Sequence, residues 1–281
     1  MTYTAGLDIG STYTKAVIAD AENNIVSRAL APTGFRLAEI ARTLLARVTE
    51  EAGLRRDDVA YVISTGFGRH QVDVSDAQVT DLTAAARGAA TFFPNTRTVL
   101  DVGGQTMKAI KLDEAGKVQA FRLNDKCAAG TGAFLEKTAR YMGYTVEEIG
   151  PLAELSREAV PISGVCAVFA ESEVINHLSQ GTSPSDIMQG AIVSLVDRSI
   201  QLMKRVQMQP QFTLTGGILR FESMGRLIRE RLGAEVNIPP PDDVQFVAAL
   251  GAAVLGQRRL KARAEQALAN AATGLDAEVR L

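Results

Sequence analysis

The feature that most constrains the fold of this chain is an internal repeat. Residues 6–20 read Gly-Leu-Asp-Ile-Gly-Ser-Thr-Tyr-Thr-Lys-Ala-Val-Ile-Ala-Asp and align without gaps on residues 99–113, which read Val-Leu-Asp-Val-Gly-Gly-Gln-Thr-Met-Lys-Ala-Ile-Lys-Leu-Asp. The separation between the two copies is too long for a solenoid, so the repeat predicts two similar lobes. Each lobe would begin with a hairpin whose turn carries an aspartate and glycines.

Hydrophobic periodicity predicts both strands and helices around the repeat. Short β-rich runs predict strands at residues 3–9, 15–20, 25–30, 59–64 and 212–215. Apolar residues at three-four spacing predict helices over residues 37–48, 84–93, 187–206 and 246–255. The chain is therefore expected to be an α/β protein.

Composition excludes several classes of partner. With 281 residues, 46% of them hydrophobic, the chain can bury a large core. Its net charge of −2 and pI near 5.8 provide no basic field for nucleic acid or an anionic membrane. The apolar run at 246–255 is too short to span a bilayer, and no signal segment is recognisable. We expect a cytoplasmic protein with no nucleic-acid or membrane partner, in which thiols bind metal or act in redox chemistry more often than they form disulfides.

The turn of the first repeat is suited to phosphate. Gly10 permits close backbone approach, and the hydroxyls of Ser11 and Thr12 can join the backbone amides in cradling a phosphate. Asp8 stands at the end of a strand and could hold Mg²⁺ through water. Taken alone, this stretch is explained equally well by an ordinary hairpin turn.

Two further glycine turns strengthen the nucleotide interpretation. Asp101 is followed by Gly103, Gly104 and Gln105, and the predicted strand at 212–215 ends in Gly216–Gly217. Together the three turns favour a nucleotide bound between two lobes. Neither Gly-x-x-x-x-Gly-Lys-Ser/Thr nor a Gly-x-Gly-x-x-Gly after a strand occurs, so the site is neither a P-loop nor a Rossmann fingerprint.

The only two cysteines each precede a helix pattern. Cys127 lies in Asn-Asp-Lys-Cys-Ala-Ala-Gly-Thr-Gly-Ala-Phe at 124–134, and Cys166 in Ser-Gly-Val-Cys-Ala-Val-Phe-Ala-Glu-Ser-Glu at 163–173. A helix N-terminus favours a thiolate, which a soft metal site requires. Two thiolates form half of a four-cysteine site, so the other half would come from a second copy or a relative. Two buried small hydrophobes, or a zinc site shared across a dimer, would explain the same residues.

Several of these motifs resemble those of a known superfamily. The Asp-x-Gly turns at 8–12 and 101–105, the glycine pair after a strand and the Ala-Leu-Gly-Ala-Ala helix at 249–253 resemble the acetate/sugar kinase, Hsp70 and actin superfamily. The two cysteine motifs are similar to one branch of it. That branch contains the activators of 2-hydroxyacyl-CoA dehydratases and the ATP-binding subunits of benzoyl-CoA reductase, and the resemblance covers nearly the whole chain.

The resemblance implies a two-lobed α/β fold of the actin/Hsp70/sugar-kinase (ribonuclease H-like) type. The first ATPase lobe would cover 1–95, with a C-terminal helix at 244–265 packing back on it. The second would cover 96–243 and carry the cysteines, and 266–281 would form a tail. The implied activity is ATP-driven delivery of low-potential electrons from a [4Fe-4S] cluster shared between two subunits, with ATP and Mg²⁺ as further cofactors.

The resemblance also implies roles for individual residues. Cys127 and Cys166 would be the cluster ligands from this chain, and Asp8, Asp101 and Glu171 would be catalytic. The nucleotide-binding residues would be Gly10, Ser11, Thr12, Lys15, Gly103, Gly104, Gln105, Gly130, Gly132, Gly216 and Gly217. Glu171 lies where the superfamily places a carboxylate near the metal and the attacking water. Glu173 is interpreted as part of a solvated helix face, and Lys15 and Lys108 would touch phosphates or form ion pairs that stabilise the lobes.

One departure from the family pattern affects the choice of function. Many activators read Gly-Gly-Gln-Asp where this chain reads Gly-Gly-Gln-Thr, ending at Thr106. The missing carboxylate favours the smaller, D-type ATP-binding polypeptide of benzoyl-CoA reductase. Its partners would be a related ATP-binding subunit that shares the cluster, catalytic reductase subunits and an electron donor such as ferredoxin. The alternative is a homodimeric activator of a 2-hydroxyacyl-CoA dehydratase.

Two rivals come from other functional classes. A sugar kinase of the same fold would need a sugar-binding carboxylate in the first lobe, and none is convincing. An actin-type assembly protein would give no reason for the two cysteine motifs. Anaerobic iron analysis would separate the cluster-bearing ATPase from the sugar kinase and from the assembly protein.

Overall fold

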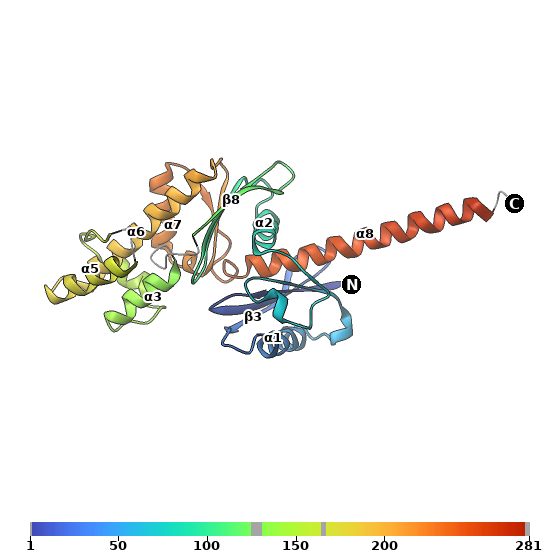
Figure 1. The fold of residues 1–281 in the computed structure, drawn as a ribbon, viewed down its shortest axis with the longest axis horizontal. Helices are drawn as coiled ribbons and strands as arrows, with labels where there is room; N and C mark the ends of the chain where they lie inside the picture. Colours follow the sequence, from blue (N-terminus) through green and yellow to red (C-terminus); the bar gives the residue numbers. More distant parts are fainter. Residues whose placement is uncertain (1, 125–130, 164–166, 279–281) are drawn as a thin grey trace. The chain divides into compact units, whose positions relative to one another are not determined.

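The chain divides into two compact units. The structure, a computed structural model, describes residues 2–124, 131–163 and 167–278. Unit 1 comprises Met1–Gly88 and Ala248–Leu281, and unit 2 comprises Ala89–Val247 (Figure 1). The boundaries lie at 88/89 and 247/248, where the sequence suggests 95/96 and 243/244. The assignment of these units as ATPase lobes stays a prediction.

Unit 1 is built on a five-stranded sheet with the order β3-β2-β1-β4-β5. The strands are β1 (Tyr3–Ile9), β2 (Tyr13–Ala19), β3 (Ile25–Pro32), β4 (Val59–Thr65) and β5 (Ala77–Gln78). Strand β1 lies in the centre, antiparallel to β2 and parallel to β4, and its apolar residues are buried. Helix α1 (Leu37–Glu51) packs on this sheet because Ala41, Leu44, Leu45 and Val48 form one buried face.

Two more helices complete unit 1. Helix α2 (Asp81–Phe92) reaches the unit boundary, and α8 (Val247–Glu278) packs across β1 and α2. A Cβ on Gly6 of β1 would collide with the backbone of Ala249, and one on Gly251 of α8 would collide with that of Ala84 in α2. These two glycines let backbones touch without intervening side chains. Beyond this contact, α8 runs on as one helix (Figure 1), and its residues 261–270 are exposed.

Unit 2 repeats the strand arrangement of unit 1. Its sheet has the order β10-β9-β6-β7-β8, with β6 antiparallel to β7 and parallel to β9. The strands are β6 (Thr98–Val102), β7 (Met107–Leu112), β8 (Val118–Asn124), β9 (Phe212–Thr215) and β10 (Val236–Asn237). Strands β6, β7 and β9 therefore correspond to β1, β2 and β4, so the sequence repeat is also a structural repeat.

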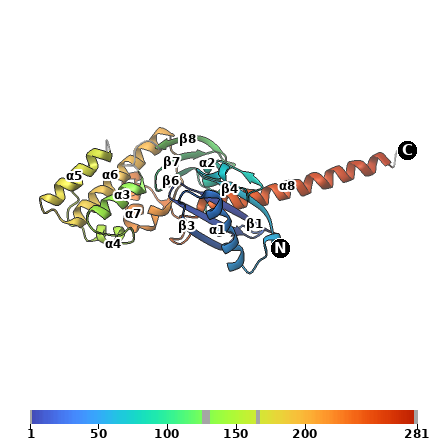
Figure 2. The same ribbon diagram turned by 60° about the horizontal axis from the view of Figure 1, so that its bottom comes forward.

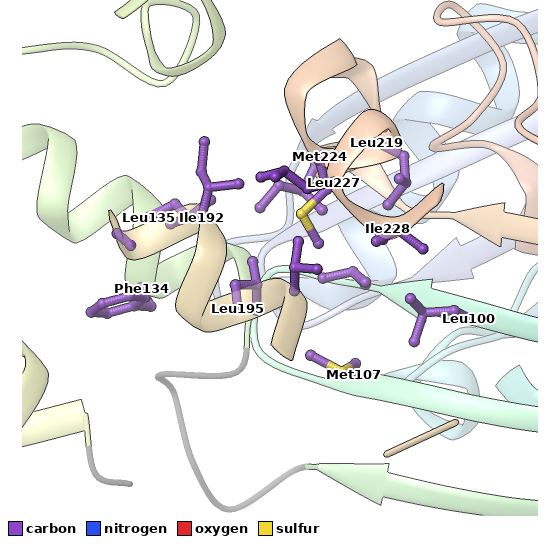
Figure 3. Close-up of a cluster of buried hydrophobic side chains, with 14 of the residues drawn as sticks. Leu100, Met107, Phe134, Leu135, Ile192, Leu195, Leu219, Met224, Leu227 and Ile228 are labelled. Carbon is purple, nitrogen blue, oxygen red and sulfur yellow. The ribbon is translucent and has the colours of Figure 1, made fainter. Parts of the chain in front are cut away.

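The helices of unit 2 gather around α6 (Figure 2). They are α3 (Gly132–Tyr141), α4 (Ile149–Glu154), α5 (Ala167–Ser179), α6 (Pro184–Arg205) and α7 (Glu222–Leu232). Short 3-10 turns in the two units cover Arg56–Asp58, Arg69–Gln71 and Gly217–Arg220. Figure 3 shows Phe134 and Leu135 of α3 with Ile192 and Leu195 of α6 in one buried apolar cluster. This core fixes α3 to the sheet that carries the second repeat.

The α/β fold class predicted from the sequence is confirmed, with one five-stranded sheet in each unit. The strands predicted at 3–9 and 212–215 match to the residue, and the other three predicted strands differ by one or two residues at one or both ends. Helix α8 begins within the ranges predicted at 246–255 and 244–265, and it extends beyond both to Glu278, through residues 266–278 of the predicted tail. Among the described helices, none combines the length and hydropathy that crossing a bilayer requires.

Candidate functional site

In unit 1, the lysine of the repeat holds the aspartate of the repeat. Asp8 on β1 lies directly opposite Lys15 on β2. Lys15 Nζ donates to Asp8 Oδ2 at 3.1 Å, and the side chains of Lys15 and Asp8 are only 20% and 12% exposed. Because the pair is largely withdrawn from water, its charges are weakly screened. The carboxylate is thereby fixed beside the turn that follows β1.

The turn of unit 1 is tied to its own sheet. Gly10 N donates to Tyr13 O at 3.2 Å, and a Cβ on Gly10 would stand 2.6 Å from the same oxygen, so the turn has no room for a side chain. Thr33, just past β3, donates from Oγ1 to Gly10 O at 2.8 Å and from its amide to Thr12 O at 2.9 Å. Ser11 is exposed at the tip and Thr12 is half-buried.

In unit 2, the corresponding aspartate has two partners. Lys108 Nζ donates to Asp101 Oδ2 at 2.9 Å, and both side chains are at most 15% exposed. Thr215, buried at the end of β9, donates from Oγ1 to Asp101 Oδ1 at 3.2 Å. Both carboxylate oxygens of Asp101 are therefore held, one by an ammonium and one by a hydroxyl.

The turn of unit 2 is tied to a helix. Gly103 N donates to Thr106 O at 2.8 Å and closes the turn. The first amides of α3 bind its carbonyls: Gly132 N donates to Gly103 O at 3.0 Å, and Ala133 N donates to Gly104 O at 2.8 Å. A Cβ on Gly132 would lie 3.3 Å from Gly103 O, which is tighter than nearly all such contacts. The N-terminus of α3 therefore rests directly on the predicted phosphate turn.

The third glycine turn joins this site. Gly216 has φ +103°, and a Cβ there would collide with the backbone of Val102, so only glycine fits. Its amide donates to Val244 O at 3.1 Å, and Gly217 opens the 3-10 turn that follows. Since β9 pairs with β6, the second and third turns lie side by side within unit 2.

Glu171 links the two helices that follow the cysteine motifs. Lys137 of α3 donates to both carboxylate oxygens of Glu171 on α5 at 2.7 Å, and Tyr141 Oη donates to Oε2 at 3.3 Å. The hydrogen bond to Glu171 raises the pKa of Lys137 above its ordinary value. The predicted role of Glu171 near metal and water stays a prediction, and the observed role is to tie α3 to α5.

Glu173 differs from its interpretation as part of a solvated face. Its side chain is half-buried, and Oε2 accepts a hydrogen bond from the amide of Ser163. Ser163 is the last described residue before the segment that contains Cys166. The interpretation was wrong because helical spacing does not reveal a backbone amide supplied by a preceding loop. Glu173 therefore ties the residue that precedes this segment, Ser163, to α5.

Three predicted site residues lie outside the described residues: Cys127, Cys166 and Gly130. The described helices α3 and α5 begin shortly after the two cysteines, at Gly132 and Ala167. Among residues 2–124, 131–163 and 167–278, no three His, Cys, Asp or Glu side chains gather into a group that could hold a metal ion.

The structure thus collects the predicted nucleotide residues into two groups. Unit 1 brings together Asp8, Gly10, Ser11, Thr12 and Lys15. Unit 2 brings together Asp101, Gly103, Gly104, Gln105, Gly132, Gly216 and Gly217, with Gln105 exposed at the turn.

Sequence reasoning missed the partners of these residues. Thr33, Ala133 and Lys137 bind predicted site residues that lie far from them in sequence. Thr33 and Lys137 belong to no quoted motif, and Ala133 lies in the Cys127 motif without a role assigned to it. One correspondence between the two units was visible in the sequence. The dipeptide Thr-Gly occurs at the end of β4, where the threonine is Thr65, and at the end of β9, where it is Thr215.

Comparison with known proteins finds relatives that match nearly the whole chain. The profile of the BadF/BadG/BcrA/BcrD ATPase family matches residues 5–256. The chain is 39% identical to a 2-hydroxyisocaproyl-CoA dehydratase activator of Clostridioides difficile over 252 residues, which cover 90% of this chain and 94% of the relative. It is 38% identical to the (R)-2-hydroxyglutaryl-CoA dehydratase activating ATPase of Acidaminococcus fermentans over 258 residues (92% and 98%). It is 36% identical to a benzoyl-CoA reductase component of Thauera aromatica over 271 residues (92% and 94%).

Solved structures support the same fold. The A. fermentans (R)-2-hydroxyglutaryl-CoA dehydratase component A superposes with a TM-score of 0.87 at 37% identity, covering 92% of this chain and 99% of that one. The C. difficile activator with bound ADPNP also gives a TM-score of 0.87 at 37% identity, covering 94% and 98%. A Streptomyces griseus ROK-family glucokinase matches at a TM-score of 0.57 and 16% identity, covering 91% and 99%, a likeness of fold alone.

Proposed function

The chain belongs to the BadF/BadG/BcrA/BcrD ATPase family, and from that premise we propose that it is an ATP-driven activator of a 2-hydroxyacyl-CoA dehydratase. The 39% and 38% identities to dehydratase activators, against 36% to the benzoyl-CoA reductase component, support this choice. The ranking reverses the preference drawn from Thr106, because one substituted residue carries less weight than identity along the whole chain.

ATP and Mg²⁺ fit the described residues. In each unit, a largely buried carboxylate stands beside a short turn that is exposed at one residue, Ser11 in unit 1 and Gln105 in unit 2. A carboxylate next to a polar turn is the chemistry that Mg²⁺ and phosphate oxygens require. Gly10 and Gly216 keep the backbone open where a side chain would fill the turn. Asp8 and Asp101 would hold the metal or orient the attacking water, while the turns bind phosphate.

A [4Fe-4S] cluster fits the donor chemistry of the two cysteines. Cys127 and Cys166 precede α3 and α5, whose N-terminal dipoles favour thiolates. They would supply two of four ligands, and a second copy of the chain would supply the others. When bound, the cluster would supply a low-potential electron for the dehydratase partner.

The contact of α3 with the phosphate turn is the observation that carries this proposal. Gly132 and Ala133 bind the carbonyls of Gly103 and Gly104, so a change at the turn displaces the start of α3. Lys137 passes that displacement to α5 through Glu171. One nucleotide turn is thus joined by hydrogen bonds to both helices that follow the cysteines.

Iron analysis of anaerobically purified protein tests the proposal. The parent should contain about four iron and four sulfide ions per dimer, and Cys127→Ala or Cys166→Ala should lose them. Mg·ATP should then stimulate electron transfer to a 2-hydroxyacyl-CoA dehydratase. Parent-like iron content in both variants would overturn the cluster assignment.

Thr106 favours an ATP-binding component of benzoyl-CoA reductase as a second candidate. That function requires a related but different chain to complete the cluster, whereas an activator would pair with its own copy. Native mass spectrometry of anaerobic protein distinguishes the two. An iron-loaded homodimer supports the activator, and a chain that takes up iron only with a different polypeptide supports the reductase.

A further inference from the structure

Thr65 in unit 1 occupies the place that Thr215 occupies in unit 2. In the parallel pairing of β1 with β4, Asp8 stands opposite Thr65, and in that of β6 with β9, Asp101 stands opposite Thr215. Residues opposite each other on neighbouring strands project to the same face of a sheet. Each threonine precedes a glycine with positive φ, +86° at Gly66 and +103° at Gly216. The structural repeat therefore extends to a Thr-Gly corner beside each aspartate.

The two threonines differ in their hydrogen bonds. Thr215 Oγ1 donates to Asp101 Oδ1 at 3.2 Å. Thr65 is fully buried, and its Oγ1 has no hydrogen-bond partner within the described part of the chain. A buried hydroxyl without a partner lowers stability, so its presence beside a predicted catalytic carboxylate requires an explanation.

The carboxylate of Asp8 presents one of its two oxygens to the corner formed by Thr65 and Gly66. Lys15 binds Oδ2. Oδ1 faces the corner that follows Thr65, since it lies 2.6 Å from where a Cβ on Gly66 would stand. Glycine at that corner leaves room for the carboxylate to turn.

We propose that Thr65 is a positioning residue for Asp8 and that its hydroxyl donates to Asp8 Oδ1 when Mg·ATP is bound. This inference rests on the proposed ATP-dependent function. A cation at Asp8 competes with Lys15 for the carboxylate and weakens the ion pair that holds it. A donor on Oδ1 then keeps the carboxylate oriented, as Thr215 does for Asp101.

The test compares Thr65→Val, which replaces the hydroxyl by a methyl, with Thr65→Ser, which keeps it. Melting temperature without nucleotide, its increase with Mg·ATP, and the Mg²⁺ concentration for half-maximal ATP hydrolysis are measured for each. The matched control is Thr4→Val on β1, because Thr4 is equally buried but its Oγ1 donates to Ala253 O at 2.9 Å.

Thr65→Val should keep or raise the melting temperature of the nucleotide-free protein, because it removes a hydroxyl without a partner. Its half-maximal Mg²⁺ concentration should rise about tenfold, which corresponds to one charge-assisted hydrogen bond. Thr65→Ser should restore the parent value. Thr4→Val should lower the melting temperature and leave the Mg²⁺ dependence unchanged.

Two results would overturn the inference alone: a Thr65→Val protein with the parent's Mg²⁺ dependence, or one destabilised like Thr4→Val with no effect specific to Mg²⁺. A parent chain that neither hydrolyses ATP nor gains stability with Mg·ATP would overturn the proposed function and this inference together. The stability of nucleotide-free Thr65→Val is read without any activity, so the two failures remain distinguishable.

Discussion

The two hairpins of this chain share a sequence but differ in what they are tied to. In unit 1 the turn is bound by Thr33, which belongs to the end of its own sheet. In unit 2 the turn is bound by the first amides of α3, the helix that follows the Cys127 motif. The same aspartate–lysine pair is present in both units, with N–O distances of 3.1 and 2.9 Å. From this difference we expect the two copies of one motif to serve two tasks, nucleotide binding in unit 1 and transmission to α3 in unit 2.

The strongest way to break the comparison is to remove the shared carboxylates. Asp8→Asn and Asp101→Asn should each reduce Mg-dependent ATP hydrolysis by about 100-fold, because each takes away charge at the site of the metal and phosphates. Steady-state hydrolysis at saturating Mg·ATP measures the effect. Circular dichroism serves as the control, because it shows whether each variant keeps its fold when the lysine has lost its carboxylate partner. If either variant hydrolyses ATP like the parent, the two turns do not share a role in hydrolysis.

Thr106→Asp sharpens the comparison at the turns themselves. It introduces the carboxylate that the family resemblance leads us to expect at this position, and it should raise the rate of ATP hydrolysis roughly tenfold, because a further anion can position metal-bound water. The matched variant in unit 1 is Tyr13→Asp, at the equivalent position of the first hairpin, which should not raise the rate. Equal responses of the two variants would show that the turns are interchangeable.

Gly132→Ala tests transmission from the turn to α3. The added Cβ, 3.3 Å from Gly103 O, should push the helix start away by a few tenths of an ångström. Alanine itself favours a helix by about 1 kcal/mol over glycine, so α3 should persist. ATP hydrolysis should stay within about threefold of the parent, while electrons delivered per ATP fall several-fold.

The counterpart in unit 1 is Thr33→Val, which breaks the hydrogen bond to Gly10 O. It should cost about 1–3 kcal/mol of unfolding free energy, because buried groups lose their partner. The ratio of electrons to ATP should not change. A fall in that ratio for Thr33→Val, or none for Gly132→Ala, would contradict the division of tasks.

The smallest effect is expected from Glu171→Gln, which weakens the link of α5 to α3. Lys137 is half-exposed, so the melting temperature should change by no more than about 2 °C. Electron delivery per ATP should fall about twofold. Because the pKa of Lys137 is raised, the link in the parent is fully present at neutral pH and is lost only as the pH rises above 10.5. Glu136→Gln on the same helix is the control, since Glu136 pairs with Arg140 within α3.

Much of the fold was predictable because the repeat places the same local signals in both units. The strands at Tyr3–Ile9 and Phe212–Thr215 end in glycine turns, which fix their boundaries. The two-hairpin arrangement follows from the aligned Asp-x-Gly motifs. The extent of α8 was not predictable from its apolar face, because residues 261–270 are exposed and the helix continues through alanine-rich sequence without that face.

The motif residues of the candidate site could be read from the sequence, and their roles stay predictions, whereas their connections could not be read. Asp8, Gly10 and Asp101 stand in motifs that a sequence displays. The contact of Gly132 with Gly103 joins residues whose neighbourhood depends on how α3 packs into the core of unit 2. The role of Glu173 was missed for a similar reason, because its donor is a backbone amide that no side-chain pattern reveals.

The length of α8 makes this helix a suitable place to attach a spectroscopic label. The family profile ends at residue 256, and the helix continues to Glu278, so 22 residues (257–278) rise about 33 Å along a single axis. Its other end is seated on Gly6 with backbone against backbone, which fixes its direction relative to β1. A fluorophore on this helix, for instance at the exposed Leu268, would rotate with unit 1, to which α8 belongs. Polarised emission from such a label would report the tumbling of that unit during turnover without disturbing the chemistry.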